Sequence, residues 1–258
     1  MKIAICIKQG PDSWAEKKMA GGVLDRAGVD AVLNDLDEYA VEEALRIVEA
    51  NSPTKEAGEA SGHTITLISM GPERATEAIR KALSMGADDA ILVTDPSLAG
   101  SDALATSLVL SEVIKKGNYD LVLCGTESTD ARMSVIPAMI SQRLGWAQLT
   151  FAGKVAVNPA ANTVEIERVT EFGNQVMSAK FPAVLSVVEK INEPRYPSFK
   201  GIMAAKKKPI TNMSLADTGV GSSDVGAAAA WSNVKEALPR PPRGAGVKLT
   251  DEGNGGEK

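Results

Sequence analysis

Short apolar runs alternate with amphipathic segments along the first half of the chain. One of these amphipathic segments begins after Ser101 or Asp102, and either residue suits the N-cap of a helix. This alternation predicts an α/β fold with a mostly parallel sheet covered by helices on both faces. Strand-like runs occupy residues 3–7, 64–69, 90–94 and 120–124, and helical periodicity marks residues 38–50, 73–85 and 134–144.

The pattern changes in the second half of the chain. Short β-type runs cover residues 155–157, 163–169, 175–178 and 183–187, and we expect them to add antiparallel strands to the same body. From residue 219 onward Gly, Ser, Ala and Pro dominate, which leaves little apolar surface to pack. The sequence therefore predicts one nucleotide-binding α/β domain over residues 1–218 and an extended, flexible C-terminal arm over residues 219–258.

The composition disfavours several classes of protein. A net charge of −5 argues against a nucleic-acid binder, and the absence of a long apolar run argues against insertion into a membrane. Two cysteines and one histidine do not suffice for a disulfide framework or a multi-histidine centre, so no metal site is expected. The first residues read as a strand rather than a signal peptide, and we expect a cytoplasmic protein.

The polar residues behind the strand at 120–124 form the strongest candidate site. A glycine, hydroxyl side chains and an aspartate precede a predicted helix here, in the order Gly125-Thr126-Glu127-Ser128-Thr129-Asp130. Ligands of doubly wound sheets bind at such strand ends, and backbone N–H groups at a helix start favour phosphate. The alternative is that Ser128, Thr129 and Asp130 only cap the helix. Dinucleotide and P-loop glycine motifs are absent.

Two other strand ends carry polar residues with open roles. Lys8 follows the first strand and is expected to meet a phosphate, a carboxylate or only solvent. Before the helix at 38–50, Asn34 is a candidate ligand-binding side chain, although an N-cap role for Asp37 is the more common arrangement. Cys6 and Cys124 fall in predicted buried strands, where cysteine behaves as a small hydrophobe.

A basic, proline-containing segment near residue 200 suggests a docking surface. Pro194 and Pro197 keep the backbone extended, and large apolar side chains follow among several lysines. Residues 190–208 hold six Lys or Arg against one Glu in an otherwise acidic chain. An apolar anchor within a basic surround suits an acidic partner surface. The alternative is a loop folded back onto its own core.

These segments resemble the β subunit of electron transfer flavoprotein. The resemblance runs from residue 3 to about 219 and includes a long, specific match from Asn192-Glu193-Pro194-Arg195-Tyr196 to Lys206-Lys207-Lys208. The other matching stretches are Ile5-Cys6-Ile7-Lys8-Gln9, Ala40-Val41-Glu42-Glu43-Ala44, Gly71-Pro72 and Ala82-Leu83-Ser84-Met85-Gly86-Ala87-Asp88.

The resemblance implies a Rossmann-like fold and a subunit that catalyses no reaction by itself. Members of this family pair with an α subunit that holds a redox-active FAD. Their β subunit binds AMP or, in electron-bifurcating members, a second FAD. The heterodimer takes electrons from acyl-CoA dehydrogenases and related flavoenzymes, and it passes them to a quinone oxidoreductase or another acceptor.

The same resemblance assigns residues to two sites. The partner-recognition loop falls at residues 187–209, with Phe199 at the position of the apolar anchor, and its partner-binding residues are Tyr196, Phe199, Lys200, Ile202 and Met203. The nucleotide-binding positions are Cys6, Asn34, Asp35, Leu36, Asp37, Met70, Gly125, Thr126, Glu127, Ser128, Thr129, Asp130, Ala131, Arg132, Met133, Ser134, Val135 and Ile136.

Two positions depart from the usual family pattern, and two other functions remain open. Glu127 replaces a common glutamine, and Arg132 stands where an acid is common, which disfavours a second flavin. Arg132 can still form charge-assisted bonds to a phosphate. A stand-alone sensor of AMP or ATP is one alternative function, but it has no need of the recognition loop. A nucleotide-dependent enzyme is the other, and it lacks a phosphate-transfer motif.

Overall fold

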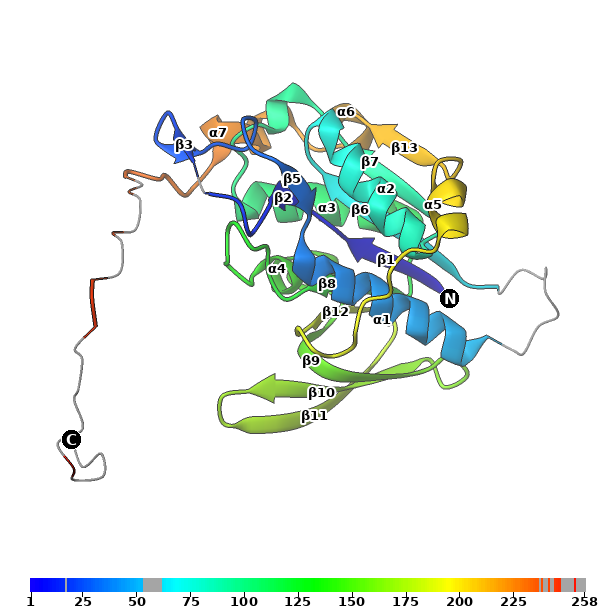
Figure 1. Ribbon diagram of the computed structural model, residues 1–258. Helices are drawn as coiled ribbons and strands as arrows, with labels where there is room; N and C mark the ends of the chain where they lie inside the picture. The colour runs from blue at the N-terminus through cyan, green and yellow to red at the C-terminus, as the bar shows by residue number, and fades with distance from the viewer. Residues whose placement is uncertain are drawn as a thin grey trace.

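The computed structural model describes residues 1–16, 18–52 and 62–236, together with residues 238, 241, 244–246 and 253. Helices cover both faces of a central sheet (Figure 1). Its parallel strands are β1 (Lys2–Cys6), β6 (Thr64–Met70), β7 (Asp89–Val93), β8 (Leu121–Gly125), β12 (Ala183–Val187) and β13 (Ile210–Met213), and β9 (Ala147–Asn158), β10 (Thr163–Thr170) and β11 (Gly173–Lys180) extend it.

The nine strands lie in the order β11-β10-β9-β12-β8-β1-β6-β7-β13. Two small antiparallel pairs, β2 (Gln9–Pro11) with β5 (Ala31–Leu33) and β3 (Met19–Ala20) with β4 (Val23–Leu24), lie outside it. The helices are α1 (Asp35–Asn51), α2 (Thr76–Met85), α3 (Ala103–Gly117), α4 (Ile136–Leu144), α5 (Phe199–Ala205), α6 (Leu215–Thr218) and α7 (Gly226–Ala229), with 3₁₀ turns η1 (Glu73–Ala75), η2 (Pro96–Leu98) and η3 (Ser222–Asp224).

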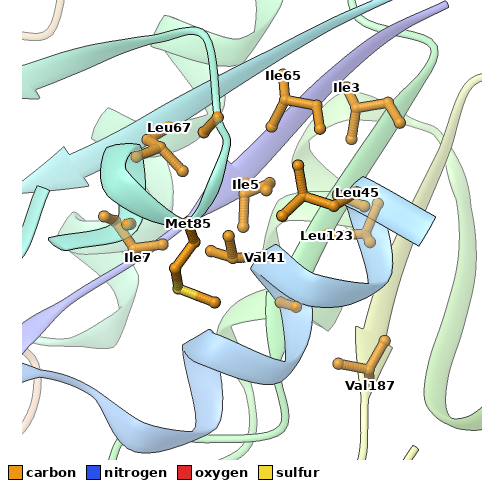
Figure 2. Packing of buried hydrophobic residues seen from close by; sticks show 14 of the residues in the cluster. Ile3, Ile5, Ile7, Val41, Leu45, Ile65, Leu67, Met85, Leu123 and Val187 are labelled. Atoms are coloured by element: carbon orange, nitrogen blue, oxygen red, sulfur yellow. The ribbon is translucent and has the colours of Figure 1, made fainter. Parts of the chain in front are cut away.

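Alternating side chains of β1 divide the core into two layers. Ile3, Ile5 and Ile7 pack beneath α1 and α2, where Figure 2 shows them beside Val41 and other apolar side chains. Residues of opposite parity on β1 pack with α3 and α4 on the other face. Because both faces of β1 are buried, it reads as a continuous apolar run, as expected of a central parallel strand.

Local capping signals set several helix boundaries. The Asp102 carboxylate caps α3 by accepting a hydrogen bond from the Ala105 N–H at 3.1 Å, which confirms one of the two predicted caps. The α2 helix ends at Gly86 and the α4 helix at Gly145, both with a positive φ that glycine adopts without strain. The prediction of a doubly wound α/β fold is confirmed.

Two strands differ from the prediction for the second half of the chain. The β12 strand is parallel to both of its neighbours, so the expectation that residues 183–187 add an antiparallel strand is wrong. Only β9, β10 and β11 form an antiparallel extension. The β13 strand, which was not predicted, pairs in parallel with β7. The β12 strand follows β11 after only two residues, yet it pairs with β8 and β9, which lie further back along the chain. Local periodicity does not determine which distant strands pair, and pairing sets the direction of a strand.

The start of the C-terminal arm packs against the domain, although the sequence predicts little apolar surface to pack there. Val220 and Val225 are buried in the layer under α3. The Gly226 N–H donates to Ser101 Oγ at 2.9 Å, and the Trp231 N–H donates to the Asp102 carboxylate at 2.8 Å. The domain boundary at residue 218 stays a prediction, and most of the arm beyond residue 236 lies outside the described residues.

Candidate functional site

The order of strands places a topological switch point between β1 and β8. Within the sheet, β6 and β7 are added on one side of β1, and the chain then crosses over to add β8 on the other side of β1. Connections that leave adjacent strands toward opposite faces make this edge the usual ligand site of open α/β sheets. The polar residues that follow β1 and β8 lie at this edge.

Lys8 and Asp130 form an ion pair across the switch point. Lys8 Nζ lies 2.8 Å from Asp130 Oδ1 and 3.3 Å from Ser128 Oγ. Arg26 donates to the other carboxylate oxygen of Asp130. The carboxylate that the sequence offered as one possible partner of Lys8 is therefore Asp130 of the same chain.

The charges of this cluster fix the protonation state of Asp130. Burial by itself raises the pKa of Asp130, whose side chain is only 3% exposed. The hydrogen bond and positive charge of Lys8, together with Arg26, overcome this effect and hold the pKa well below its usual range. One carboxylate thus faces two cations, and the surplus positive charge favours an anion nearby.

Asn34 fastens the loop after β8 to the start of α1. Its Nδ2 group donates to the Glu127 carbonyl at 3.0 Å, and its Oδ1 atom accepts from the Thr129 N–H at 3.0 Å. Asn34 is buried, so both polar atoms of its amide serve the loop. Asn34 therefore supports the loop of the predicted nucleotide site through its backbone. This role differs from the direct hydrogen bond to a ligand that the sequence suggested.

Asp37 lies inside α1 and is not its N-cap, which corrects the expectation from the sequence. The helix begins two residues earlier than Asp37, and Asn34 occupies the N-cap position. The buried Asp37 carboxylate accepts a hydrogen bond from the Lys8 N–H at 2.8 Å. Burial raises its pKa from 3.8 to about 7, although hydrogen bonds from Asn34 and Lys8 oppose this effect.

Gly125 lets the start of α1 approach the end of β8. A Cβ atom at this position would lie 2.6 Å from Asp37 Oδ1 and 2.7 Å from the Leu36 carbonyl oxygen, closer than side chains tolerate. Thr126 then donates a 2.6 Å hydrogen bond to the Val187 carbonyl, which ties the loop to the end of β12. The path of the chain away from β8 is therefore closely constrained.

The loop at residues 126–135 does not cap the following helix with the predicted side chains. The α4 helix begins at Ile136 and has Val135 at its N-cap, without a side-chain cap. Ser128 and Asp130 bond Lys8 instead, so the capping alternative for these residues is wrong. In the described part of the chain, the N–H groups of Met133, Ser134, Val135 and Ile136 meet no acceptor.

This part of the loop has an unusual backbone conformation. Arg132 and Ser134 have φ values of 48° and 55°, in the left-handed region. The Ser134 hydroxyl donates to Glu127 Oε2 at 3.0 Å, and Arg132 lies 3.6 Å from the other carboxylate oxygen. Consecutive unpaired N–H groups beside a helix start form the kind of concavity that binds phosphate.

The remaining predicted nucleotide-site residues lie at the same edge but contribute differently. Cys6 is buried opposite Cys124 in the β1–β8 register, where its hydrogen bond with the Cys124 thiol, followed by burial, raises the pKa of Cys124. Met70 ends β6 and packs partly against the layer under α3. Asp35 is exposed and accepts from Ser13, and Ala131 and Met133 are exposed as well.

Two arginines at this edge were missed by the sequence analysis. Arg26 reaches Asp130 from a stretch that has no hydrophobic period to reveal its position. Arg74 donates to the carbonyls of Arg26 and Ala27 at 3.1 and 3.2 Å and to that of Val29 at 3.3 Å. Arg74 thereby holds the segment that carries Arg26, and no local signal in the sequence pairs these two residues.

The recognition loop presents its large apolar side chains to solvent. Tyr196 is 97% exposed and Phe199 is 79% exposed, so the alternative of a loop folded onto its own core is wrong for these side chains. Phe199, Ile202 and Met203 share the outer face of α5 because they are spaced three and four residues apart. We call Tyr196, Phe199, Ile202 and Met203 the docking stripe.

The inner face of α5 rests on α2. A Cβ atom on Gly201 would lie 2.6 Å from the Ser84 carbonyl oxygen, so only glycine permits this close contact. Lys208 also belongs to this contact, since its Nζ bonds the carbonyls of Leu83, Gly86 and Ala87 at the end of α2. Lys208 is therefore not a free surface lysine, whereas Lys200, Lys206 and Lys207 are exposed.

The described residues lack a membrane-spanning helix and a cluster of metal-ligating side chains. None of the described helices is long and apolar enough to cross a membrane. No group of three or more His, Cys, Asp or Glu side chains in the described ranges is arranged to hold a metal ion.

Comparison with known proteins identifies the family. The electron transfer flavoprotein domain matches residues 21–218. The chain is 48% identical over 259 residues to electron transfer flavoprotein subunit beta of Mycobacterium bovis and of Mycobacterium tuberculosis, covering 99% of this chain and 95% of each relative. It is 34% identical over 261 residues to the subunit beta of Megasphaera elsdenii, covering 98% of this chain and 92% of that relative. This confirms the resemblance seen in the sequence: the chain belongs to the electron transfer flavoprotein family, in which these relatives are β subunits.

Proposed function

We propose that this chain is the β subunit of a heterodimeric electron transfer flavoprotein, that it binds AMP as a structural ligand, and that it docks flavin dehydrogenases. Electrons from an acyl-CoA dehydrogenase then pass through the FAD of an α subunit to a quinone oxidoreductase or another acceptor. FAD supplies the redox chemistry when bound, and this chain supplies binding surfaces. The exposed docking stripe on a firmly held loop is the observation that carries the docking role.

The switch-point edge has the features that a nucleotide phosphate requires. Unpaired N–H groups at residues 133–136 are available as donors, and Arg132 adds an exposed guanidinium beside them. The surplus positive charge of Lys8 and Arg26 over Asp130 favours an anion at the same edge. These observations support AMP at this position, with residues 34–37 and Met70 at its margins.

The docking stripe has the composition of an interface anchor. Two aromatic and two aliphatic side chains lie exposed in the same segment of the chain as the exposed Lys200, Lys206 and Lys207. Aromatic anchors contribute most when a partner buries them, and surrounding charges speed the encounter. A stand-alone nucleotide sensor has no use for this arrangement, which favours the electron-transfer role over that alternative.

Phe199→Ala tests the docking role directly. In the heterodimer with its α subunit, we expect dehydrogenase-dependent reduction of FAD to lose roughly thirtyfold in kcat/KM, since truncation of an interface anchor costs about 2 kcal/mol. Phe199 is mostly exposed, so the Tm and the FAD content should not change. Unchanged reduction kinetics in an intact heterodimer would rule out Phe199 as the docking anchor.

Calorimetric titration of the isolated chain with AMP and with FAD tests the nucleotide assignment. We expect AMP to bind with a stoichiometry of about one, as a single site on one edge requires, and FAD to bind weakly or not at all. The lone chain should accordingly be colourless and become yellow only with its α subunit. Tight, stoichiometric FAD binding by the chain alone would overturn this part of the proposal.

A further inference from the structure

We propose that Arg195 is a positioning residue for docking: its clamp on Glu42 and Glu49 of α1 fixes the orientation in which the recognition loop presents Tyr196 and Phe199. This inference rests on the proposed docking function. It assigns a role to three charged residues that make up none of the apolar contact surface.

The guanidinium of Arg195 binds two carboxylates at once. Its Nε and one terminal nitrogen donate to the two oxygens of Glu42 at 2.7 and 3.1 Å. Its terminal nitrogens also donate to the two oxygens of Glu49 at 2.7 and 3.1 Å. The Arg195 backbone N–H adds a 3.2 Å bond to Glu42. Such paired bonds fix the plane of a guanidinium and therefore orient the backbone that carries it.

Glu42 makes the clamp strong on its inner side. Its side chain is only 4% exposed, and it accepts a further hydrogen bond from Arg46 at 2.9 Å. Although burial raises the pKa of Glu42, its bonds to Arg195 and Arg46 lower that pKa overall, so the carboxylate stays charged. Loss of Arg195 would leave this carboxylate with one cation in place of two. Glu49, in contrast, is 56% exposed.

A second attachment lies three residues before Arg195. Asn192 is buried, and its Nδ2 group donates to the Tyr39 carbonyl at 3.1 Å and to Glu43 Oε2 at 2.9 Å. Both acceptors belong to α1. The segment between β12 and α5 is thus joined to one helix at two points, although it has no regular secondary structure of its own.

The far end of the recognition loop is held by a different helix. Arg80 of α2 donates to the carbonyls of Ala205 and Lys208, both at 2.6 Å. The Ser198 hydroxyl caps α5 by accepting from the Gly201 N–H at 3.0 Å. Only three residues, Tyr196, Pro197 and Ser198, lie between Arg195, which is clamped to α1, and the start of α5, which rests on α2. A chain this short, with both ends fixed, has few conformations available.

This geometry makes preorganisation the expected effect of Arg195. A loop that is ordered before the encounter does not lose that conformational freedom on binding, so the complex forms at a lower dehydrogenase concentration. Release of the clamp should therefore raise KM for the dehydrogenase. The kcat at saturation depends on the assembled complex and should change little.

The test compares Arg195→Gln with Arg46→Gln in the intact heterodimer. Arg46 bonds the same Glu42 carboxylate, but in the described part of the chain it donates no hydrogen bond to the recognition loop. We expect Arg195→Gln to raise KM for the dehydrogenase roughly tenfold and to speed amide exchange at residues 193–199. Arg46→Gln should leave both quantities close to those of the parent protein.

Two further variants separate this inference from the docking role. If Arg195 acts by orienting Phe199, Arg195→Gln should add little to the effect of Phe199→Ala in the double variant. Glu49→Gln, which removes the exposed half of the clamp, should give a smaller rise in KM. It also keeps the test available if Arg195→Gln fails to assemble.

The outcomes are distinct. The inference is overturned if Phe199→Ala impairs docking while Arg195→Gln matches Arg46→Gln, or if the Arg195 and Phe199 effects are fully additive. If Phe199→Ala shows no docking defect, the proposed role of Phe199 as the anchor is itself overturned. A tenfold rise in KM with faster local exchange, together with a non-additive double variant, supports the clamp as the device that positions the docking stripe.

Discussion

Lys8 Nζ and Asp130 Oδ1 lie 2.8 Å apart and join the chain after β1 to the chain after β8. These two strands pair directly in the sheet, yet their connections leave in opposite directions from the switch point. The ion pair therefore spans the edge at which ligands of such sheets bind, and it holds the two segments there together. It also leaves Arg26 and Lys8 with one positive charge that Asp130 does not match.

Asp130→Ala is expected to weaken AMP binding more than Cys124→Ala does. Loss of the carboxylate frees Lys8 and Arg26 and unlinks the loop that carries the unpaired N–H groups. Hydrogen bonds to charged groups contribute about 1.5–3 kcal/mol, and here they hold the loop in place. We therefore expect the loss of loop order to outweigh the extra positive charge left at the edge, so that the affinity falls at least about tenfold. Calorimetric titration of the two folded variants with AMP measures the difference.

Cys124→Ala serves as the matched control because Cys124 is buried in β8 near the same edge. Its loss removes a small apolar side chain from the core, which should lower stability slightly and leave the AMP affinity nearly unchanged. Equal AMP affinities for the two variants would refute the ranking and remove Asp130 from the site.

Gly125→Ala is expected to destabilise the fold. The added Cβ would contact Asp37 Oδ1 and the Leu36 carbonyl at under 3 Å, and the start of α1 must shift to make room. Overpacking of this kind costs about 1–3 kcal/mol. Urea unfolding measures the loss. Gly10→Ala is the control, because a Cβ at Gly10 meets Asp130 at an ordinary 3.8 Å. Similar losses for both variants would contradict the close-approach argument.

Asp37 should make the fold less stable as the pH rises. The folded-state pKa is raised from 3.8 to about 7, so the native protein keeps a proton that the unfolded chain has already lost in this range. Stability therefore falls between about pH 4 and pH 7, and the full cost of the buried charge is present above pH 7.

Asp37→Asn removes this titration while keeping an acceptor for the Lys8 N–H. The variant should gain stability relative to the parent protein at about pH 8, by up to about 4 kcal/mol, and show little gain near pH 4. Denaturant unfolding across this range measures the difference. A gain that is independent of pH would show that Asp37 does not titrate between the two limits.

The sequence sufficed for the parts of the fold that local patterns determine. Alternating apolar runs and helical stripes are local, so most of the parallel sheet, the helices α1 to α4 and the cap at Asp102 could be predicted. The α5 helix lies in a segment that the sequence presented as a loop. The direction of β12 and the pairing of β13 with β7 depend on contacts between strands that are distant in the sequence, and no local pattern encodes them. The burial of Val220 and Val225 likewise depends on contacts with distant residues.

The candidate site shows the same division between local and distant information. The glycine and polar residues after β8 were visible in the sequence because they follow a strand directly. The partners that give them their roles come from far along the chain: Arg26 bonds Asp130, and Asn34 bonds the Glu127 carbonyl. Hydrogen bonds with sequence separations near one hundred residues leave no spacing signal. The N-cap role expected for Asp37 was wrong because α1 begins at Asp35 and the Asp37 carboxylate accepts from the Lys8 N–H instead.

The lysines that end the recognition loop should fall into two classes. Lys206 and Lys207 are exposed, whereas Lys208 bonds the terminal carbonyls of α2 at Leu83 and Gly86, 3.2 and 3.3 Å away. Exposed charges near an interface speed the encounter with an acidic partner, and salt screens them. A lysine on the last carbonyls of a helix stabilises that helix.

Lys206→Gln with Lys207→Gln should therefore lower the association rate of the dehydrogenase and flatten its dependence on ionic strength, with no change in Tm. Lys208→Gln should do the reverse, lowering stability by about 1 kcal/mol because three carbonyls lose a charged donor, while the salt dependence of association stays that of the parent protein. Stopped-flow mixing at several ionic strengths and thermal unfolding measure the two effects side by side. If Lys208→Gln alone flattens the salt dependence and leaves Tm unchanged, Lys208 is a steering charge and its bonds to the end of α2 are not the source of its contribution.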